Sequence, residues 1–310
     1  MNRYISLDYA HILNYIALPI NVQVQYSAIH SDLQYPQVII IPSPGGLSYC
    51  FTPHTHDAVE LIYILEGSMI LSIGENRYTA HPGELYIANP YEIHSAYLTE
   101  ETPSVRYVYI TAPLHELCFS PGTQIQELTT DLLEARRHCM NFCRDSQISA
   151  AIGSRMLEMA HVYPNQKNTG EAECILLGEM YRILAALIGA SVITATNGSE
   201  QKAILFVRKV SQFLEDHYMH EITPQMLTEQ FSYHPDYFSR LFSKLFGIPF
   251  RTYLTEYRIS RAMELFLRSE ETSVHEIAAK VGFSDYCYFS HMFKKHVGIS
   301  PTEYLKSKHT

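Results

Sequence analysis

The chain has 310 residues, 46% of them hydrophobic, which is enough for two ordinary domains that each bury a core. A formal net charge of -9 argues at first against a nucleic-acid partner. The charge is divided unevenly, because residues 1–200 hold 9 Lys and Arg against 20 Asp and Glu (net -11), whereas residues 201–310 hold 14 against 12 (net +2). Any contact with a polyanion must therefore come from the C-terminal part.

The N-terminus lacks the apolar run of a signal peptide, and the most apolar later segment, 175–193, is interrupted by Glu179 and Arg182. Six cysteines without CxxC spacing fit reduced intracellular thiols better than a disulfide framework. Cys139 and Cys143 lie one helical turn apart, which is more typical of a buried apolar pair than of a metal or redox site. We therefore expect a cytoplasmic protein without a membrane span.

Residues from about 20 to 112 alternate apolar and polar positions in short runs that Pro, Gly and Asn interrupt. Strands are predicted at 37–41, 61–65, 68–73 and 104–110, and many short strands at close spacing indicate a barrel or a sandwich. These strands are rich in tyrosine, whose rings would either stack on a bound effector or fill the core. The tyrosines concerned are Tyr49, Tyr63, Tyr86, Tyr97, Tyr107 and Tyr109.

From about residue 124 to 193 the apolar residues recur at helical spacing. One apolar stripe falls on a helix at about 171–192 and consists of Leu176, Leu177, Met180, Ile183, Leu184 and Leu187. The small polar segment 194–201 is typical of a linker. Everything after it is predicted to be helical.

The C-terminal part carries clear signals for helix ends. Helices begin with Thr223 before Pro224 and with capping boxes at 273–276 and 300–303. Gly247, Gly282 and Gly298 stand where left-handed C-caps would end helices. The predicted helices are 203–217, 224–231, 235–246, 250–269, 274–281, 285–297 and 301–308.

A repeated sequence lies within these helices. The segment Tyr237-Phe-Ser-Arg-Leu-Phe-Ser-Lys-Leu-Phe-Gly-Ile is echoed 51 positions later (288 - 237) by Tyr288-Phe-Ser-His-Met-Phe-Lys-Lys-His-Val-Gly-Ile. Each copy is a helix preceded by a turn and a shorter helix, which is the helix-turn-helix pattern. The helix 250–269 between the copies would be roughly 30 Å long, close to the ~34 Å between successive major-groove faces on one side of B-DNA.

The segment from Gly282 through Pro301 to Tyr304, together with Leu227, Tyr257-Arg258, Ala262 and Ile277-Ala278, resembles the signature of the arabinose-regulator (AraC/XylS) family over about 203–306. The resemblance implies a DNA-binding domain whose third and sixth helices read the major groove. The base-reading positions it implies are Asp236, Ser239 and Arg240, and then Tyr286, Cys287 and His291. Ser290 shares the outward face, and Lys244, Lys294 and Lys295 are suited to phosphate contacts; the alternative for the last two is that they are solvated surface charges.

Two departures make the repeat units unequal. Arg240 keeps the guanidinium that can bind a guanine edge with two hydrogen bonds, whereas the matching place in the second unit, usually arginine in the family, is His291. Asp236 would repel phosphate and could at best accept a hydrogen bond from a cytosine amino group. We therefore expect the first unit to read bases more strongly and the second to contribute more to binding of the DNA phosphate backbone.

In the N-terminal part, the cupin barrel's two motifs are resembled by His54-Thr-His56-Asp-Ala-Val-Glu60 with Gly67 after six intervening residues, and by Pro82-Gly83 with His94. In metal-dependent cupins residues of these types converge on one divalent ion, and imidazole with carboxylate suits Fe, Mn, Ni, Cu or Zn. Three interpretations stay open: a polar lining for an effector pocket, which we favour and to which Tyr49 would belong, a structural hydrogen-bond cluster, or a metal site.

We therefore expect a two-domain protein: a cupin-like all-β barrel at 1–122, a helical extension at 123–193, a linker at 194–201 and an all-α domain of two helix-turn-helix units at 202–310. It would bind double-stranded DNA under control of a small effector such as a sugar, and would engage RNA polymerase if it activates. The family resemblance also implies a homodimer. The apolar stripe would either pack on its own barrel or pair with a second copy, and both interpretations stay open. The alternative function is a metal-dependent cupin enzyme or a metal sensor with a DNA-binding tail, although no other catalytic motif is visible.

Overall fold

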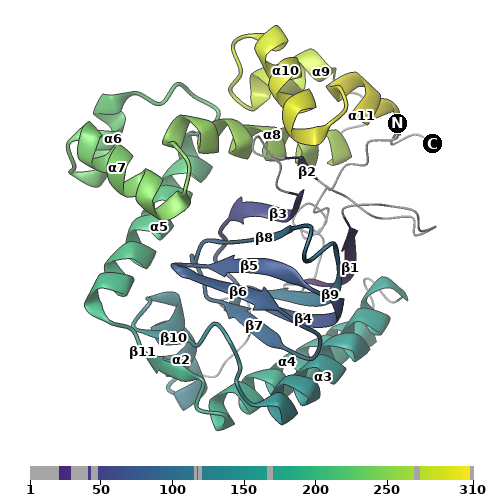
Figure 1. Cartoon of the computed structure of the whole chain (residues 1–310). Helices are drawn as coiled ribbons and strands as arrows, with labels where there is room; N and C mark the ends of the chain where they lie inside the picture. Colours follow the sequence, from purple (N-terminus) through teal and green to yellow (C-terminus); the bar gives the residue numbers. More distant parts are fainter. Residues whose placement is uncertain are drawn as a thin grey trace. The chain divides into compact units, whose positions relative to one another are not determined.

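The computed structural model describes residues 21–28, 41–42, 48–114, 117, 121–165, 170–268 and 273–307 (Figure 1). The chain divides into two compact units with a boundary between Phe206 and Val207. The first unit contains the β-sheets and the helices that follow them, and the second contains the helix-turn-helix repeats. This division agrees with the predicted pairing of a sheet-rich domain with an all-helical one.

Two larger antiparallel sheets form the β part of the first unit (Figure 1). One has the order β1 (Asn21–Ala28), β9 (Ser104–Ala112), β4 (Val59–Gly67), β7 (Leu85–Ala88). The other has the order β2 (Ile41–Pro42), β3 (Ser48–His54), β8 (His94–Leu98), β5 (Met69–Ile73), β6 (Asn76–Ala80). The strands predicted at 61–65, 68–73 and 104–110 are confirmed as parts of β4, β5 and β9, whereas most of the strand predicted at 37–41 lies outside the described residues.

Strand β4 is buried on both faces, and successive side chains therefore enter two different cores. Leu61 belongs to a core that the sheet shares with helices, whereas Ile62 and Ile64 belong to the core between the two sheets. Glu60 lies on the same face as Ile62 because the side-chain period of a strand is two. The alternation therefore places a carboxylate among the apolar side chains of the barrel interior.

Two glycines permit close approaches that no other residue allows. Gly67 has φ +70°, and a Cβ built there would lie 2.1 Å from the carbonyl oxygen of Ser104. Gly153 lies on α3 (Ser146–Asn165) against β4, where a Cβ would lie 2.4 Å from the ring of Tyr63. Both contacts fix the position of β4, one at its end and one on its helix-facing side.

The helical part of the first unit consists of α2 (Gln124–Leu133), β10 (Arg137–Cys139), α3, α4 (Gly170–Gly189) and β11 (Ile193–Ala195). Helix α3 packs on the strands of the β1-β9-β4-β7 sheet, and α4 packs on α3 (Figure 1). The apolar stripe of α4 is buried in the core of its own unit, with Met180 and Ile183 fully covered. Of the two interpretations of this stripe, packing on the same domain is the one observed.

The segment 194–201, predicted to be a linker, has regular structure. Ile193–Ala195 is β11, which pairs with β10, and α5 runs from Gly198 to His217. Asn197 caps α5, because its Oδ1 accepts hydrogen bonds at 3.0 Å from the backbone N–H groups of Ser199 and Glu200. The small polar residues that suggested a flexible connection here serve as a strand end and a helix cap.

The remaining helices are α6 (Pro224–Phe231), α7 (Pro235–Phe246), α8 (Phe250–Arg268), α9 (Val274–Lys280), α10 (Tyr286–Val297) and α11 (Pro301–Ser307). Their bounds match the predicted ones to within a residue. Thr223 caps α6, Ser273 and Glu276 form a capping box at α9, and Gly247 and Gly298 adopt left-handed C-caps. Only the first helix of this part starts earlier than predicted, by five residues.

Cys139 and Cys143 are buried free thiols, as expected for a buried apolar pair. Burial raises the pKa of Cys139 to about 12, so its thiol is protonated near neutral pH. Within the described helices, no segment combines the length and apolar character needed to cross a membrane.

Candidate DNA-binding helices and effector site

Helices α7 and α10 occupy equivalent places in the two repeat units and are built alike. Each starts at a side-chain cap: His234 Nδ1 accepts from the backbone N–H of Asp236 at 3.3 Å, and Asp285 Oδ1 accepts from that of Tyr288 at 3.0 Å. The inner faces are phenylalanine-rich and buried. The residues buried on them are Phe238, Phe242, Phe246, Phe289, Phe293 and Val297.

The opposite faces carry the predicted DNA contacts. Ten residues were predicted there, and all of them except Tyr286 and Ser290 are exposed. Those two are half-buried, and the ring of Tyr286 stacks on His275 with centroids 5.6 Å apart. The exposed ones are Asp236, Ser239, Arg240, Lys244, Cys287, His291, Lys294 and Lys295. Helix spacing therefore identified an accessible face, and the role of each residue on it stays a prediction.

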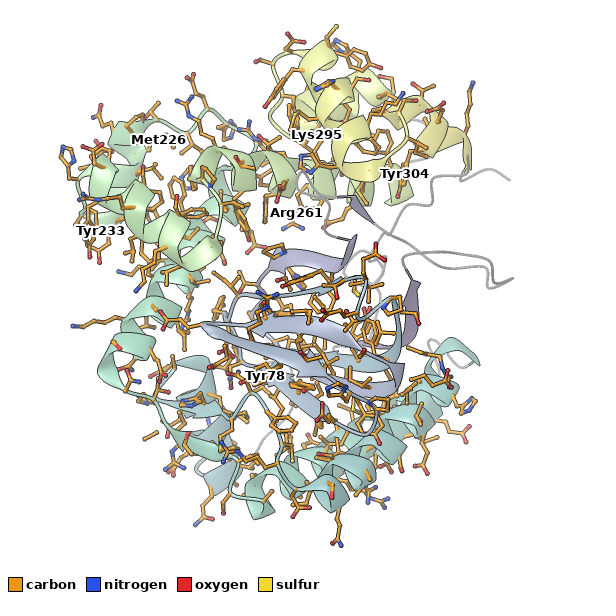
Figure 2. The ribbon with its side chains drawn as sticks, viewed as in Figure 1. Tyr78, Met226, Tyr233, Arg261, Lys295 and Tyr304 are labelled. Carbon is orange, nitrogen blue, oxygen red and sulfur yellow. The ribbon has the colours of Figure 1, made fainter. Side chains whose placement is uncertain are left out.

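Exposed tyrosines on the same helices were missed by the sequence reasoning. Tyr237 and Tyr288 stand at equivalent repeat positions and are 48% and 49% exposed. Tyr233, which is labelled in Figure 2 and lies just before α7, is also exposed. It lies edge-on to Tyr237 with ring centroids 5.0 Å apart. The signal was present in the repeat, which begins with tyrosine in both copies. A half-exposed ring in this place can contact both sugar and phosphate of DNA.

A half-buried ionisable pair lies where α10 packs on α8. His296 Nδ1 is 3.9 Å from Glu256 Oε1. Burial lowers the pKa of His296 to about 4, and the charge of Lys295 contributes to this. Burial raises the pKa of Glu256 to about 7, although Lys295 opposes this. Near neutral pH the histidine is therefore neutral, so the two groups are not held by opposite charges despite their closeness.

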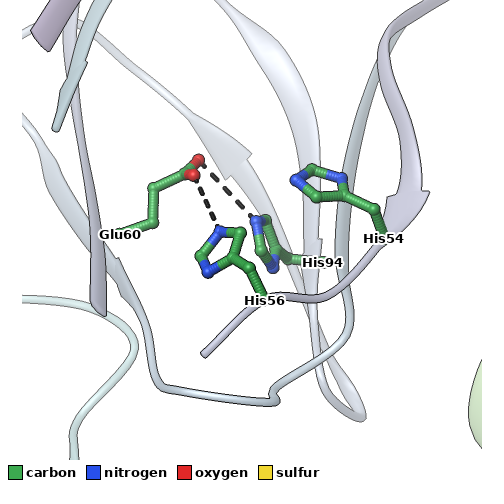
Figure 3. Close-up of side chains that lie close together, drawn as sticks. All are labelled: His54, His56, Glu60 and His94. Atoms are coloured by element: carbon green, nitrogen blue, oxygen red, sulfur yellow. Dashed lines mark hydrogen bonds and ion pairs between the residues drawn. The ribbon is translucent and has the colours of Figure 1, made fainter. Parts of the chain in front are cut away.

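A polar cluster lies in the barrel interior and unites the predicted residues His54, His56, Glu60 and His94 (Figure 3). His54 ends β3 and pairs in register with His94 of β8, while Glu60 comes from β4 and His56 from the connection between β3 and β4. The rings of His54 and His94 are 4.3 Å apart, and those of His56 and His94 are 5.0 Å apart. Residues distant in sequence thus form one site.

Glu60 is the centre of this cluster. Its Oε2 lies 3.1 Å from His56 Nε2 and accepts from Thr111 Oγ1 at 3.1 Å, while its Oε1 lies 3.7 Å from His94 Nε2. Burial raises the pKa of Glu60, but interactions with His56 and His94 outweigh it and hold the pKa well below its ordinary value. Burial lowers the pKa of His94, but Glu60 outweighs it and leaves that pKa raised.

The tyrosines predicted on the strands divide between two environments. Tyr86, Tyr107 and Tyr109 are buried in the core between the sheets, and Tyr86 donates a hydrogen bond to Glu84 at 2.7 Å. Tyr63 faces the other way and packs beside α3. The side chain of Tyr49, which was predicted to bind an effector, lies outside the described residues.

The turn before His94 is tied to the helical extension. Glu92 Oε2 accepts from Asn89 Nδ2 at 2.9 Å and from Asn141 Nδ2 at 2.8 Å. The backbone N–H of Tyr91 donates to the carbonyl of His56 at 2.7 Å. The two histidine-bearing segments are thereby joined to each other and to the residues that follow β10.

Two matched helix-turn-helix units behind a sheet-rich domain define a two-domain DNA-binding transcription regulator. Two family profiles match the chain, a helix-turn-helix domain over residues 227–307 and an AraC-like ligand binding domain over residues 45–178. The chain belongs to the AraC family of transcription regulators, as the resemblance in its sequence implied.

Relatives support this assignment along most of the chain. The chain is 25% identical to the Msm operon regulatory protein of Streptococcus mutans over 258 residues, which cover 83% of this chain and 87% of that protein. It is 24% identical over 257 residues to the helix-turn-helix transcriptional regulator YdiP of Escherichia coli, covering 82% of this chain and 80% of that protein. The structure of Vibrio cholerae ToxT with a bound unsaturated fatty acid is similar in fold, with a TM-score of 0.51 at 16% identity over 92% of this chain and 94% of that one.

Proposed function

We propose that this protein is a one-component regulator in which a small effector, bound in the N-terminal barrel, controls sequence-specific binding of double-stranded DNA by α7 and α10. The observation that carries the DNA-binding part is the pair of equivalent helices, each with a buried aromatic face and an exposed face that bears Arg240 or Lys294. Effector binding would bias one arrangement of DNA-binding domains over another.

The proposed base readers are Asp236, Ser239 and Arg240 on α7 and Tyr286, Cys287 and His291 on α10. We propose that the DNA phosphate backbone is contacted by Lys244, Ser290, Lys294 and Lys295. Arg240 is the main determinant of specificity, because an arginine can bind the two acceptors of a guanine edge at once. His291 offers at most one donor in the neutral form and reads bases less strongly.

For the effector we propose a hydroxyl-bearing molecule of the sugar class. The cluster of His54, His56, Glu60 and His94 supplies both donors and acceptors in an otherwise apolar interior. The anionic Glu60 disfavours a carboxylate ligand such as the fatty acid named for ToxT. Thermal unfolding of the protein in the presence of a panel of sugars, and separately of a fatty acid, distinguishes these two classes of effector. The class that binds should raise the unfolding midpoint.

We also propose that the regulator acts as a homodimer and, where it activates, contacts RNA polymerase. Since the stripe of α4 is used within its own core, pairing would involve the outward side, where Ile175, Tyr181 and Ile188 are exposed. A monomeric mass at micromolar concentration would reject the dimer. If a dimer forms through this side, Ile188→Glu should weaken it.

The test of the proposed function is fluorescence anisotropy with the DNA upstream of the protein's own operon and a scrambled duplex of equal length. We expect salt-sensitive binding that favours the upstream DNA at least about tenfold. Equal binding of the two duplexes would reject a sequence-specific regulator. A metal-dependent enzyme is the competing function, and it requires the cluster around Glu60 to hold a metal.

A further inference from the structure

Backbone carbonyls set the tautomer that two imidazoles of the barrel cluster take when they are neutral. His56 Nδ1 donates to the carbonyl of Ala58 at 3.1 Å, and His94 Nδ1 donates to that of Glu92 at 2.9 Å. A carbonyl oxygen can only accept, so the proton of each neutral ring lies on Nδ1 and the lone pair on Nε2. Backbone carbonyls bound to the far nitrogen are the usual partners of metal-ligating histidines.

Both Nε2 atoms face the Glu60 carboxylate, at 3.1 Å from His56 and 3.7 Å from His94. Each Nε2 faces the carboxylate either as the N–H donor of a protonated ring or, when the ring is neutral, as a lone pair that a shared cation would bridge to the carboxylate. His94 Nε2 is buried without a hydrogen-bond partner among the described residues. A buried polar atom without a hydrogen-bond partner costs free energy, and a metal ion bound to it would remove that cost.

The donor atoms converge closely enough for one ion. One ligand atom from each of His54, His56, Glu60 and His94 lies within 4.8 Å of all the others. Two ligands on the same ion are at most about 4.2 Å apart, since metal–nitrogen bonds measure about 2.1 Å. Shifts of a few tenths of an ångström in each side chain would close the remaining gap.

The surroundings hold the donors in place. Glu60 and His94 have side chains only 5% and 0% exposed, and Thr111, which pairs with Glu60 across β4 and β9, donates a hydrogen bond to its carboxylate. Three imidazoles with one carboxylate favour Zn²⁺, Co²⁺, Ni²⁺, Cu²⁺ or Fe²⁺, because Mg²⁺ and Ca²⁺ prefer sites made of oxygen ligands.

We infer that His54, His56, Glu60 and His94 bind one divalent transition-metal ion in the barrel interior. This inference deepens the proposed function at the same site and rests on it only for the regulatory meaning of the metal. A six-coordinate ion with four protein ligands keeps positions for oxygen atoms of water or of a hydroxyl-bearing effector.

Metal binding is measured on the full-length protein without an affinity tag, after removal of metals with a chelator. Titration with Zn²⁺ by calorimetry, and with Co²⁺ by visible absorption, should give one equivalent per chain. Glu60→Gln and His56→Ala should each weaken Zn²⁺ binding by at least about a hundredfold, beyond what loss of an outer partner costs. His81→Ala is the matched control, because His81 is an exposed histidine of the same unit outside the cluster.

Less than half an equivalent of either metal, or binding that Glu60→Gln and His56→Ala leave unchanged, would overturn the inference. His56 is half-buried, so His56→Ala remains informative if the more deeply buried Glu60→Gln fails to fold, which circular dichroism detects. DNA binding is assayed separately on the metal-free protein. A regulator that binds its operator but no metal rejects the metal site alone, and one that binds metal but no operator rejects the proposed function alone.

Discussion

Asn89 and Cys139 exchange two hydrogen bonds across 50 residues of sequence. Asn89 Nδ2 donates to the carbonyl of Cys139 at 2.9 Å, and the backbone N–H of Cys139 donates back to Asn89 Oδ1 at 2.7 Å. Cys139 ends β10, which pairs with β11 shortly before α5 begins. The loop that precedes His94 is therefore fastened to β10, whose partner strand β11 lies shortly before α5 in the chain.

Asn89→Ala should remove this connection and leave two buried backbone groups of Cys139 without partners. We expect the free energy of unfolding of the first unit to fall by about 2–4 kcal/mol. Amide hydrogen exchange in residues 137–143 should increase as well. Asn76→Ala is the control, since the Asn76 side chain makes an exposed hydrogen bond to Asn141. This substitution should lower the free energy of unfolding by less than about 0.5 kcal/mol. Unchanged exchange at 137–143 in Asn89→Ala would show that the connection is not needed.

Arg240→Ala should lower affinity for the operator by about 10- to 100-fold, while binding of scrambled DNA changes little. His291→Ala should lower the affinity for the operator clearly less, because an imidazole can make only one hydrogen bond where the guanidinium of Arg240 makes two. Anisotropy titrations with both duplexes measure this difference. The exposed Arg182 of α4 supplies a control substitution, Arg182→Ala, that removes an equal charge elsewhere. Equal losses for the two reading helices would contradict the predicted asymmetry.

Lys294→Ala should weaken binding to operator and scrambled DNA alike, since a phosphate contact carries no sequence information. The slope of log K against log salt should become shallower by about 0.9 for each phosphate contact removed. Affinities measured at four salt concentrations give this slope. An unchanged slope would mean that Lys294 is a solvated surface charge, which is the alternative that its sequence left open.

Glu256→Gln should stabilise the second unit in a pH-dependent manner. Burial raises the pKa of Glu256 to about 7, above the ordinary value of 4.5. The folded state then holds the proton that the unfolded state releases, so the stability of the wild type falls as pH rises from about 5 to 7. We expect the variant to be more stable by about 1–2 kcal/mol at pH 8 and equal at pH 4.5. Urea unfolding at both pH values tests this, and an equal difference at both would contradict it.

Local signals predicted the second unit almost completely. Thr223, Ser273, Gly247 and Gly298 cap the helices in the structure because capping depends on neighbours within four residues, which a single sequence contains. The 51-residue repeat located both α7 and α10, because a repeat is visible within a single sequence. Tyr237 and Tyr288 were missed although the repeat displays them, because an aromatic residue in a helix is more often expected in the core.

The first unit was predicted less completely because its decisive contacts are distant in sequence. Strands β10 and β11 are short and polar, so only their pairing with each other makes them strands. Periodicity revealed an apolar stripe on α4 but could not name its partner, which is the core shared with α3 and the sheet. The grouping of His54 with His94 was implied by the cupin resemblance, while the fixed tautomers depend on carbonyl positions that no sequence pattern displays.

The double burial of β4 limits how this regulator can change during evolution. Inserting or deleting one residue in the strand would exchange Glu60 with its neighbours, moving the carboxylate into the helix-facing core and a Val59 or Leu61 side chain into the barrel. A new effector preference must therefore arise by substitutions at fixed positions or by changes in the loops, because altering the length of this strand would lose the site and the fold together.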